Sequence, residues 1–554
     1  MTSYADRPWL ARYEAGQPGD ITPDYATGLD IFRAAVAAQP QMDAIRYFDQ
    51  SISFTELDAA STSFAAALLE HDLQRGDRVG LYLQNDPAFL IALIGTWKAG
   101  CAAVAINPMN KQRELSYLLG DSGAVALVCL DDLYDQVAKE VISAPDSAVR
   151  LVVTCSALDH QSRSDERVLG GTVKHTPEGT LDLDTLVAQF ADRSVADPGL
   201  TPDDLAVLTY TSGTTGQPKG AINTHANLAF NAQTYRDWIH LKAGDPVIAI
   251  APLFHITGLV AGVMTALLLP APLVLFHRFE PGVALDAIRE HQPVFTVAAI
   301  TAFLALSNAP GATPEDFASL RTLYSGGAPI APAMADRLEK IFGAYIHNVY
   351  GLTETTSPSH AVPLGVRAPV DPVSGALSVG VPVYNTVVRV IDDEGNDVPP
   401  GEVGEFATSG PQVVAGYWQK PEATASSLPN GELRTGDVGF MNEDGWYFVV
   451  DRKKDMINAS GYKVWPREVE DVLYTHPAVR EAAVVGVPDE YRGETVRAFV
   501  SLTDGQTVTP EELVQFAKEQ MAAYKYPREV RILEELPKTV TGKILRRELR
   551  DTNG

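Results

Sequence analysis

Cysteine is scarce in this chain, and its scarcity excludes several classes of protein. Cys101, Cys129 and Cys155 are the three cysteines among 554 residues. Their odd number and the absence of metal-ligand spacing predict buried, reduced thiols rather than a disulfide framework or a zinc site. The N-terminus, MTSYADRPWL, lacks a basic stretch followed by an apolar one, so we expect no secretory signal and a cytoplasmic protein. Internal repeats and low-complexity tracts are also missing.

Positive charge is in short supply as well. The chain has 44 Lys and Arg against 70 Asp and Glu, a formal charge of −26, which argues against nucleic acids and anionic membranes as partners. Residues 452–554 contain 17 basic and 17 acidic residues, so the whole excess lies before residue 452. A neutral tail on an acidic body predicts a separate C-terminal domain, and it would suit polyanionic ligands.

The most apolar segment of the chain is interrupted by two prolines. Gly258–Phe276 is long enough to cross a bilayer, but Pro270 and Pro272 divide it. We expect a buried helix to about Leu269 and then a buried strand, with no transmembrane segment.

Residues 45–106 alternate between strand and helix patterns. Strand, helix and strand at this spacing indicate parallel pairing and an α/β fold. The predicted elements are a hairpin of Ile45–Phe48 and Ser51–Phe54 around Asp49-Gln50, a helix capped by Thr55 that runs to about Glu70, a strand at Val79–Leu83, a helix that starts at Asn85-Asp86-Pro87 and stops before Gly100, and a strand at Ala102–Ile106. Residues 155–180 are polar and aperiodic, which predicts a surface excursion.

The pattern changes after about residue 380. Alternating strands with Asp-Glu-Gly and Glu-Asp-Gly turns predict a β-rich subdomain over about residues 380–450. A smaller α+β pattern follows, with helices predicted at Pro466–Tyr474 and Pro510–Ala522 and strands at Ala482–Val487 and Arg497–Leu502. The predicted architecture is a large N-terminal domain of α/β layers, residues 1–452, and a small C-terminal domain, residues 453–554.

Residues 209–220, TYTSGTTGQPKG, carry the strongest chemical signal. Hydroxyl residues surround three glycines, and Lys219 is the single cation. Glycines let backbone N–H groups approach an anion, and hydroxyls and a lysine add donors to phosphate oxygens. The segment is not a P-loop, which needs G-x-x-x-x-G-K-[ST]. A flexible Ser/Thr/Gly linker is the alternative, but the fixed Pro-Lys-Gly ending between two apolar runs favours a loop that grips polyphosphate.

The sequence TSGTTGQPKG resembles the phosphate loop of the adenylate-forming superfamily, which includes acyl-CoA synthetases, adenylation domains of peptide synthetases and firefly luciferase. The resemblance covers nearly the whole chain. Further motifs occur in the family's order: TLYSGGAPI (322–330), HNVYGLTETT (347–356), ELRTGDVG (432–439), DRKKDMINASGYKVWPREVE (451–470) and ELPKTVTGKILRREL (535–549).

The resemblance implies a nucleotide site. Tyr350 would offer a face for the purine, Thr353 would donate to the α-phosphate, and Glu354 would hold Mg²⁺, a hard cation that suits carboxylate and phosphate oxygens. Asp437 and Arg452 would bind the ribose; the alternatives are an ordinary turn aspartate and a solvated basic run, Arg452-Lys453-Lys454. The complete set implied for ATP and AMP is Thr211, Ser212, Gly213, Thr214, Thr215, Lys219, Gly326, Gly327, Ala328, Pro329, Asn348, Tyr350, Gly351, Asp437 and Arg452.

The C-terminal motifs imply a mobile domain with a catalytic lysine. Lys543 matches the family's catalytic lysine, whose charge would relieve the repulsion between a carboxylate and a triphosphate. Lys454 matches the hinge, and Gly461, with Tyr462 and Lys463, falls where the family runs its backbone against pantetheine. Basic residues on this domain that could meet CoA phosphates are Lys463, Arg467, Lys525 and Arg528.

His255, in APLFHITG, is implied to lie between the acyl pocket and the thiol tunnel, whereas a lone histidine beside apolar residues is more often part of the core. Phe254-His255 contains no carboxylate, which weakens an amino-acid substrate. The predicted pocket wall is small and apolar, and it comprises Leu259, Val260, Gly262, Val263, Ala299, Thr301, Ala302 and, on one side, Ser325. Such a pocket favours a medium or long fatty acid, or a bulky alicyclic acid.

The resemblance implies an AMP-forming acyl-CoA synthetase with ATP, Mg²⁺ and CoA. A carboxylic acid would react with ATP to give acyl-AMP and pyrophosphate, and CoA would then displace AMP. Two alternatives share these motifs: an acyl-AMP ligase that loads a carrier protein, and a luciferase-like oxygenase. The oligomeric state is open, a homodimer included, as are the pathway and the general base of the thioester step. Acetylation of Lys543 would cancel its charge and switch the enzyme off.

Overall fold

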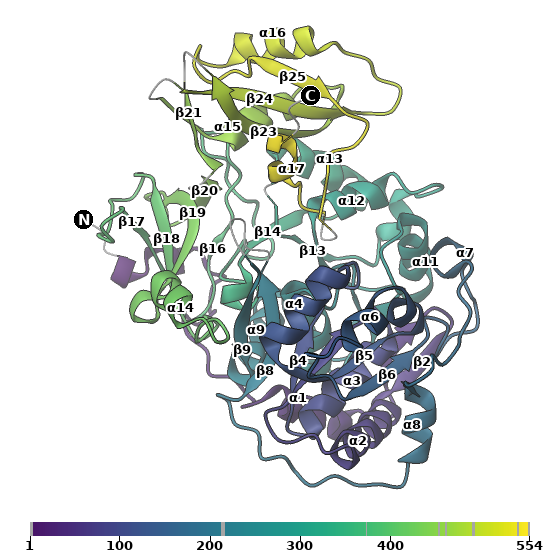
Figure 1. Cartoon of the computed structure of the whole chain (residues 1–554). Helices are drawn as coiled ribbons and strands as arrows, with labels where there is room; N and C mark the ends of the chain where they lie inside the picture. Colours follow the sequence, from purple (N-terminus) through teal and green to yellow (C-terminus); the bar gives the residue numbers. More distant parts are fainter. Residues whose placement is uncertain are drawn as a thin grey trace.

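The structure is a computed structural model. It describes residues 4–211, 217–328, 330–372, 374–452, 455–459, 462–489, 493–539 and 542–551, with only the backbone of Arg452, Tyr462, Lys463 and Asp551. Figure 1 shows a large body of sheets and helices, a β-rich unit at its side and a smaller C-terminal unit above it.

The body contains two large sheets, which are mainly parallel. Within the described residues the first sheet has seven strands, β7 (Leu181–Asp182), β6 (Leu151–Cys155), β5 (Ala124–Leu130), β3 (Arg78–Tyr82), β4 (Ala102–Ala105), β8 (Leu205–Thr211) and β9 (Lys219–Thr224), in that order. The second has nine, β16 (Val381–Pro382), β15 (His360–Ala361), β14 (Ile346–Tyr350), β13 (Thr322–Ser325), β12 (Phe295–Ala298), β10 (Val247–Ile248), β11 (Leu273–Leu275), β1 (Asp43–Tyr47) and β2 (Gln50–Ser53). The predicted parallel pairing of the strands around residues 79 and 102 is confirmed by the β3–β4 register.

The helices of the body lie around these two sheets in Figure 1. Their bounds are α1 (Gly28–Ala38), α2 (Phe54–Glu70), α3 (Pro87–Lys98), α4 (Gln112–Ser122), α5 (Asp131–Leu133), α6 (Lys139–Ile142), α7 (Glu166–Leu169), α8 (Leu183–Gln189), α9 (His225–Ile239), α10 (Thr265–Leu268), α11 (Pro281–His291), α12 (Ile300–Ser307) and α13 (Pro332–Phe342). A further helix, α14 (Pro421–Ser427), lies with the β-rich unit in Figure 1.

The cap predicted for α2 was wrong by two residues. The Ser53 side chain accepts the N–H of Glu56, and the Glu56 carboxylate accepts the N–H of Ser53, so this pair forms a capping box that starts the helix two residues before Thr55. Such a reciprocal pair satisfies two backbone donors at once, which a lone threonine cannot do. Phe54 therefore belongs to the helix and not to the preceding strand.

The segment from residue 258 to 276 forms a buried helix and then a strand, as predicted. Gly258–Met264 winds as a π-helix, α10 continues it, and β11 follows the two prolines. Every residue of the π-helix is buried. No helix among the described residues combines the length and the apolar character needed to span a bilayer.

The prediction of a surface excursion at residues 155–180 was wrong in part. Val168 and Leu169 of α7 are buried. Arg167 forms an ion pair of 2.6 Å with Asp286 of α11, and Arg163 forms one of 2.8 Å with Glu290. The segment therefore connects the seven-stranded sheet to α11 of the second sheet through ion pairs. Ion pairs between distant segments produce no periodic pattern in the sequence, so they could not be predicted.

The β-rich unit and the C-terminal unit each have a sheet of their own. The former has the strands β17 (Val387–Ile391), β18 (Gly404–Ser409), β19 (Leu433–Met441) and β20 (Tyr447–Arg452). The latter has β21 (Ile457–Ala459), β22 (Tyr462–Val464), β23 (Val479–Asp489), β24 (Gly493–Leu502) and β25 (Glu529–Ile532), with the helices α15 (Pro466–Tyr474), α16 (Pro510–Gln520) and α17 (Arg546–Asp551). The predicted α/β body with a β-rich subdomain and an α+β C-terminal part is confirmed. All three cysteines are buried and unpaired, as expected.

Candidate active site

Three groups of predicted site residues lie where neighbouring parallel strands end. The register pairs Ala298 of β12 with Ser325 of β13, and Ser325 with Asn348 of β14. The segments that follow these strands therefore leave the sheet side by side. In open α/β sheets this carboxyl edge is where ligands bind.

The glycines after β13 are required by the backbone. A Cβ at Gly326 would lie 2.8 Å from the carbonyl oxygen of Val349, and Gly327 has a φ of +80°. The hydroxyl of Ser325 is fully buried and has no hydrogen-bond partner among the described residues. The Asn348 amide donates to the Ser378 carbonyl oxygen at 3.1 Å. Ala328 is half-buried beside them, and Pro329 lies outside the described residues.

The two residues predicted to bind the base and the ribose are hydrogen-bonded to each other. The Tyr350 hydroxyl donates to Asp437 Oδ2 at 2.7 Å, and Asp437 is 4% exposed. The β19–β20 register places Asp437 directly opposite Arg452, the other predicted ribose residue. Gly351 lies so close to the Ser357 carbonyl that a side chain there would overlap it. The fold therefore brings these four predicted residues into one corner.

The corner for the phosphates is built around a residue that the sequence analysis missed. Lys219 Nζ lies 4.2 Å from the ring centre of Tyr417, and the Tyr417 hydroxyl donates to Glu354 Oε1 at 2.6 Å. Asn223 donates to the carbonyl oxygen of Thr353 at 3.2 Å. Thr211 ends β8, whereas Ser212, Gly213, Thr214 and Thr215 lie outside the described residues. Tyr417 lies in the run GYWQKPEAT (416–424), beside a second aromatic residue, Trp418. Nothing in this run indicates that Tyr417 contacts Lys219 and Glu354.

This corner offers one carboxylate, Glu354, that could bind Mg²⁺ together with the phosphates of ATP. Among the described residues, no three His, Cys, Asp or Glu side chains gather closely enough to hold a metal by themselves. Mg²⁺ commonly binds through one or two carboxylates together with substrate phosphates. Glu354 has one oxygen on Tyr417 and a second for a cation, so it could serve as that carboxylate.

Lys543 is carried by a loop that lies on the body. Gly542 has a φ of +78°, and the Lys543 N–H donates to Thr539 Oγ1 at 3.0 Å. Thr301 Oγ1, at the start of α12, donates to the Gly542 carbonyl oxygen at 3.3 Å. Figure 1 draws this loop in yellow, where it reaches from the C-terminal unit toward α12. Thr301, predicted as a wall of the acyl pocket, thus also contacts the loop that carries Lys543.

His255 lies within electrostatic reach of Lys543. It is half-buried, and its Nδ1 accepts the N–H of Thr257 at 3.3 Å. Burial lowers the pKa of His255 to about 4, and the positive charge of Lys543 contributes in the same direction. The imidazole is therefore neutral near pH 7, and the fold brings together two residues that belong to different domains in the predicted division.

The remaining predicted acyl residues lie on two elements. Leu259, Gly262 and Val263 are buried on the π-helix, and Ala302 is half-buried beside Thr301 on α12. A Cβ at Gly258 would collide with the Pro252 carbonyl at 2.1 Å, whereas at Gly262 its nearest neighbour would be Leu273 at 3.8 Å. Gly258 is thus fixed by packing, and Gly262 is not.

The residues predicted for the hinge and for CoA are described incompletely. Lys454 and Gly461 lie outside the described residues, and Tyr462 and Lys463 are described only as the backbone of β22.

The suggestion that Arg467 meets CoA phosphates was wrong for this conformation. Arg467 is 3% exposed, and its guanidinium donates to the Val449 carbonyl oxygen at 2.8 Å. Lys525 forms an ion pair of 2.5 Å with Glu468, and Arg528 packs over Tyr526. Arg546 of α17 joins Asp451 of β20 at 3.0 Å, a link between the two units that the sequence analysis did not foresee.

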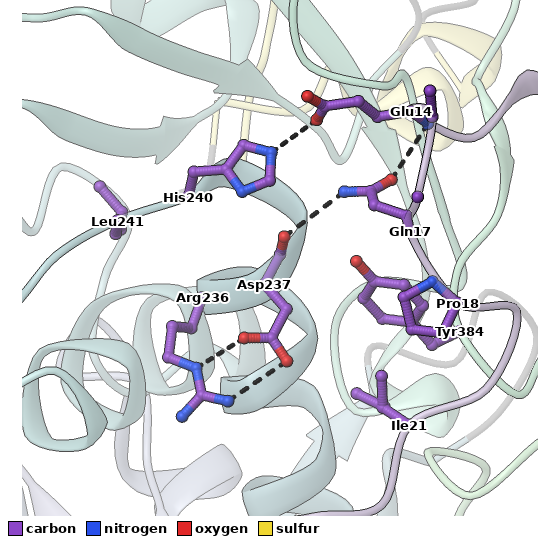
Figure 2. Close-up of a pocket in the computed structure, with 11 residues that line it drawn as sticks. Glu14, Gln17, Pro18, Ile21, Arg236, Asp237, His240, Leu241 and Tyr384 are labelled. Atoms are coloured by element: carbon purple, nitrogen blue, oxygen red, sulfur yellow. Dashed lines mark hydrogen bonds and ion pairs between the residues drawn. The ribbon is translucent and has the colours of Figure 1, made fainter.

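A separate pocket of about 520 Å³ lies away from these residues. Figure 2 shows its lining, which comes from residues 14–18, Ile21, the end of α9 and Tyr384. A 2.6 Å hydrogen bond between His240 Nε2 and Glu14 Oε2 forms part of its wall. None of the predicted site residues lines it.

Comparisons with known proteins agree with this arrangement. A family model described as AMP-binding enzyme matches residues 32–418, and one described as AMP-binding enzyme C-terminal domain matches residues 468–543. A long-chain-fatty-acid–CoA ligase of Escherichia coli O6:H1 (strain CFT073) is 38% identical over 98% of this chain and 98% of that protein. A long-chain-fatty-acid–CoA ligase of Bacillus subtilis (strain 168) is 35% identical, with the same shares covered.

A solved structure is similar over nearly the same length. The benzoate CoA ligase from Burkholderia xenovorans LB400 superposes with a TM-score of 0.83 and 27% identity, covering 95% of this chain and 100% of that one. The chain belongs to the family of AMP-binding enzymes, the adenylate-forming superfamily that its motifs resemble.

Proposed function

We propose that the protein is an AMP-forming acyl-CoA synthetase, which joins a hydrophobic carboxylic acid to CoA through an acyl-adenylate. The observation that carries this proposal is the position of the Lys543 loop, which is docked on Thr301 beside the neutral His255. The full-length similarity to CoA ligases supports the same activity.

In the first step the carboxylate attacks the α-phosphorus of ATP, and pyrophosphate leaves. Lys219 would hold the leaving phosphates, and Thr353 and Lys543 would stabilise charge at the α-phosphate. Mg²⁺, bound by Glu354 and the phosphates, would supply further charge neutralisation. Asp437, Tyr350 and Arg452 would fix the nucleoside so that the α-phosphorus meets the acid in line.

In the second step the thiol of CoA attacks the acyl carbonyl carbon, and AMP leaves as an anion of low basicity. We propose that the C-terminal domain, residues 453–554, pivots near Lys454 between the steps. The Thr301–Gly542 hydrogen bond and the Asp451–Arg546 ion pair both cross the proposed boundary and would have to break. The thiol gives up its proton as the carbon–sulfur bond forms and the acyl–phosphate bond breaks.

For the acid we propose a medium or long fatty acid, with a bulky alicyclic acid as the second candidate. The buried apolar face of the π-helix supports a hydrophobic chain, and no charged residue occurs in Gly258–Met264 to pair with a second carboxylate. The names of the two bacterial relatives favour the fatty acid. A cytoplasmic location, a homodimer and control by acetylation of Lys543 stay predictions.

The test is mass spectrometry of the purified enzyme with ATP, Mg²⁺ and a mixed pool of carboxylic acids, with and without CoA. Acyl-CoA in one tube, and acyl-AMP with pyrophosphate in the other, would support the proposal and identify the acid. Acyl-AMP in both tubes with no CoA ester would favour loading of a carrier protein. Light or CO₂ from added acyl-adenylate would favour a luciferase-like oxygenase.

A further inference from the structure

Tyr417 contacts two residues that serve different parts of the triphosphate site. Lys219 Nζ lies over the face of its ring at 4.2 Å, and its hydroxyl donates to Glu354 Oε1 at 2.6 Å. Lys219 begins β9 and Glu354 follows β14, so the two residues come from different sheets. Tyr417 is the side chain that joins them.

The backbone holds Tyr417 in place. The Trp418 N–H donates to the Gly220 carbonyl oxygen at 2.7 Å, and the Ile222 N–H donates to the Gly416 carbonyl oxygen at 3.0 Å. These bonds add the segment to the edge of β9, and Tyr417 pairs directly with Ala221. The Tyr417 N–H also donates to Thr424 Oγ1 at 2.9 Å, and the residue is 6% exposed. The ring therefore has little freedom, and both of its contacts are fixed relative to β9.

Each contact constrains one partner in a different way. A tyrosine ring attracts an ammonium group through its negative face, which holds Lys219 without neutralising its charge. A hydrogen bond to a carboxylate is charge-assisted and directional, so it occupies one oxygen of Glu354 and sets the direction of the other. The lysine keeps its full charge for phosphate, and the carboxylate keeps one oxygen for a cation.

We propose that Tyr417 is a positioning residue that sets the distance between the phosphate-binding cation, Lys219, and the metal-binding carboxylate, Glu354. This inference rests on the proposed function, because it takes Mg·ATP as the ligand. The hydroxyl serves the metal through Glu354, and the ring serves the phosphates through Lys219. The two roles are separable by substitution.

The experiment is isothermal titration calorimetry of ATP binding with Mg²⁺ and with EDTA. It compares the wild type, Tyr417→Phe and Tyr417→Leu. Tyr13→Phe is the matched control, because the Tyr13 hydroxyl donates to the Pro382 carbonyl oxygen at 2.7 Å and does not contact the site. Thermal unfolding of each variant reports the structural cost of the change.

Tyr417→Phe keeps the ring, so we expect ATP affinity in EDTA to stay within about twofold of the wild type. The gain in affinity from Mg²⁺ should fall about tenfold, as for the loss of one charge-assisted hydrogen bond. Tyr417→Leu should lose this gain and, in addition, about two- to fivefold in EDTA, the size of a cation–π contact. Tyr13→Phe should change neither value.

Equal affinities of Tyr417→Phe and wild type under both conditions would overturn the proposal. So would an equal loss with Mg²⁺ and with EDTA, together with a lowered melting temperature, since that pattern indicates a structural role. The titration uses only ATP and Mg²⁺ and therefore does not depend on the acid or on CoA. Failure of the proposed ligase activity would appear separately, in the mass-spectrometry experiment on the wild type.

Discussion

The two walls of the candidate site are built differently. On the nucleotide wall, functional side chains bond to each other: Tyr350 to Asp437, and Tyr417 to Glu354. On the opposite wall, the loop of Lys543 is shaped by bonds within itself, between Thr539 and Lys543, and meets the body through a 3.3 Å bond from Thr301. A group that must act in one step and leave in the next needs a contact that breaks easily, whereas a binding frame gains from being preorganised.

The largest expected effect comes from the loop. Lys543→Ala should slow acyl-adenylate formation about a thousandfold, because it removes a charge aimed at the α-phosphate. The thioester step from supplied acyl-AMP should stay within about twofold, since the loop has withdrawn by then. ATP–pyrophosphate exchange and single-turnover thioester formation measure the two steps. An equal loss in both would contradict the proposed movement.

Gly542→Ala should give the next largest effect. A Cβ there would lie 2.2 Å from Thr301 Oγ1, and the φ of +78° disfavours alanine. We expect adenylation to fall about tenfold to a hundredfold, from a clash and backbone strain of a few kcal/mol together. Thioester formation from supplied acyl-AMP should change little. ATP–pyrophosphate exchange measures the adenylation step, and single-turnover thioester formation measures the second step.

The matched control for this clash is the double variant Thr301→Ala with Gly542→Ala. Removing the hydroxyl relieves the overlap, so adenylation should recover in part, limited by the strain that remains at residue 542. If the double variant is no better than Gly542→Ala alone, the loop does not dock on Thr301 during adenylation.

Asp437→Asn tests the nucleotide wall and should have a smaller effect on both steps alike. Replacing the carboxylate by an amide weakens charge-assisted bonds to the ribose hydroxyls, a loss of about tenfold in affinity. The KM for ATP in pyrophosphate exchange and the KM for acyl-AMP in thioester formation should rise together. A change confined to one step would remove the contrast between the two walls.

The smallest expected effect is a change in the pKa of His255, which reports how close Lys543 lies to it. The pKa of His255 is lowered to about 4 by burial and, to a lesser extent, by Lys543. In Lys543→Met a repulsive charge disappears, protonation becomes easier, and the pKa should rise while staying below the ordinary value of about 6.5. Imidazole NMR titration, assigned with His255→Gln, measures it. An unchanged pKa would place Lys543 out of reach of His255 in solution.

Much of the local structure followed from the sequence. Asp86 and Pro87 were predicted to start a helix, and the Asp86 side chain accepts the Phe89 N–H while Pro87 takes the first turn. Capping and proline act over three or four residues, so such signals can be recognised without a fold. The error at Thr55 has the same origin. Ser53 and Thr55 are both residue types that cap helices, and the local sequence does not show at which of them the helix begins.

The sequence by itself determined the family: its motifs, in their order along the chain, match those of adenylate-forming enzymes, and this resemblance implies which residues would bind phosphate, ribose and magnesium. It could do so because each motif is a contiguous run of residues, which can be recognised before the fold is known. The tertiary structure alone decided that Tyr417 joins Lys219 to Glu354, that Lys543 lies near His255, and that Arg467 is buried rather than free for CoA. Those contacts join segments that are distant in the chain, and they depend on how whole sheets and helices pack, which no local pattern records.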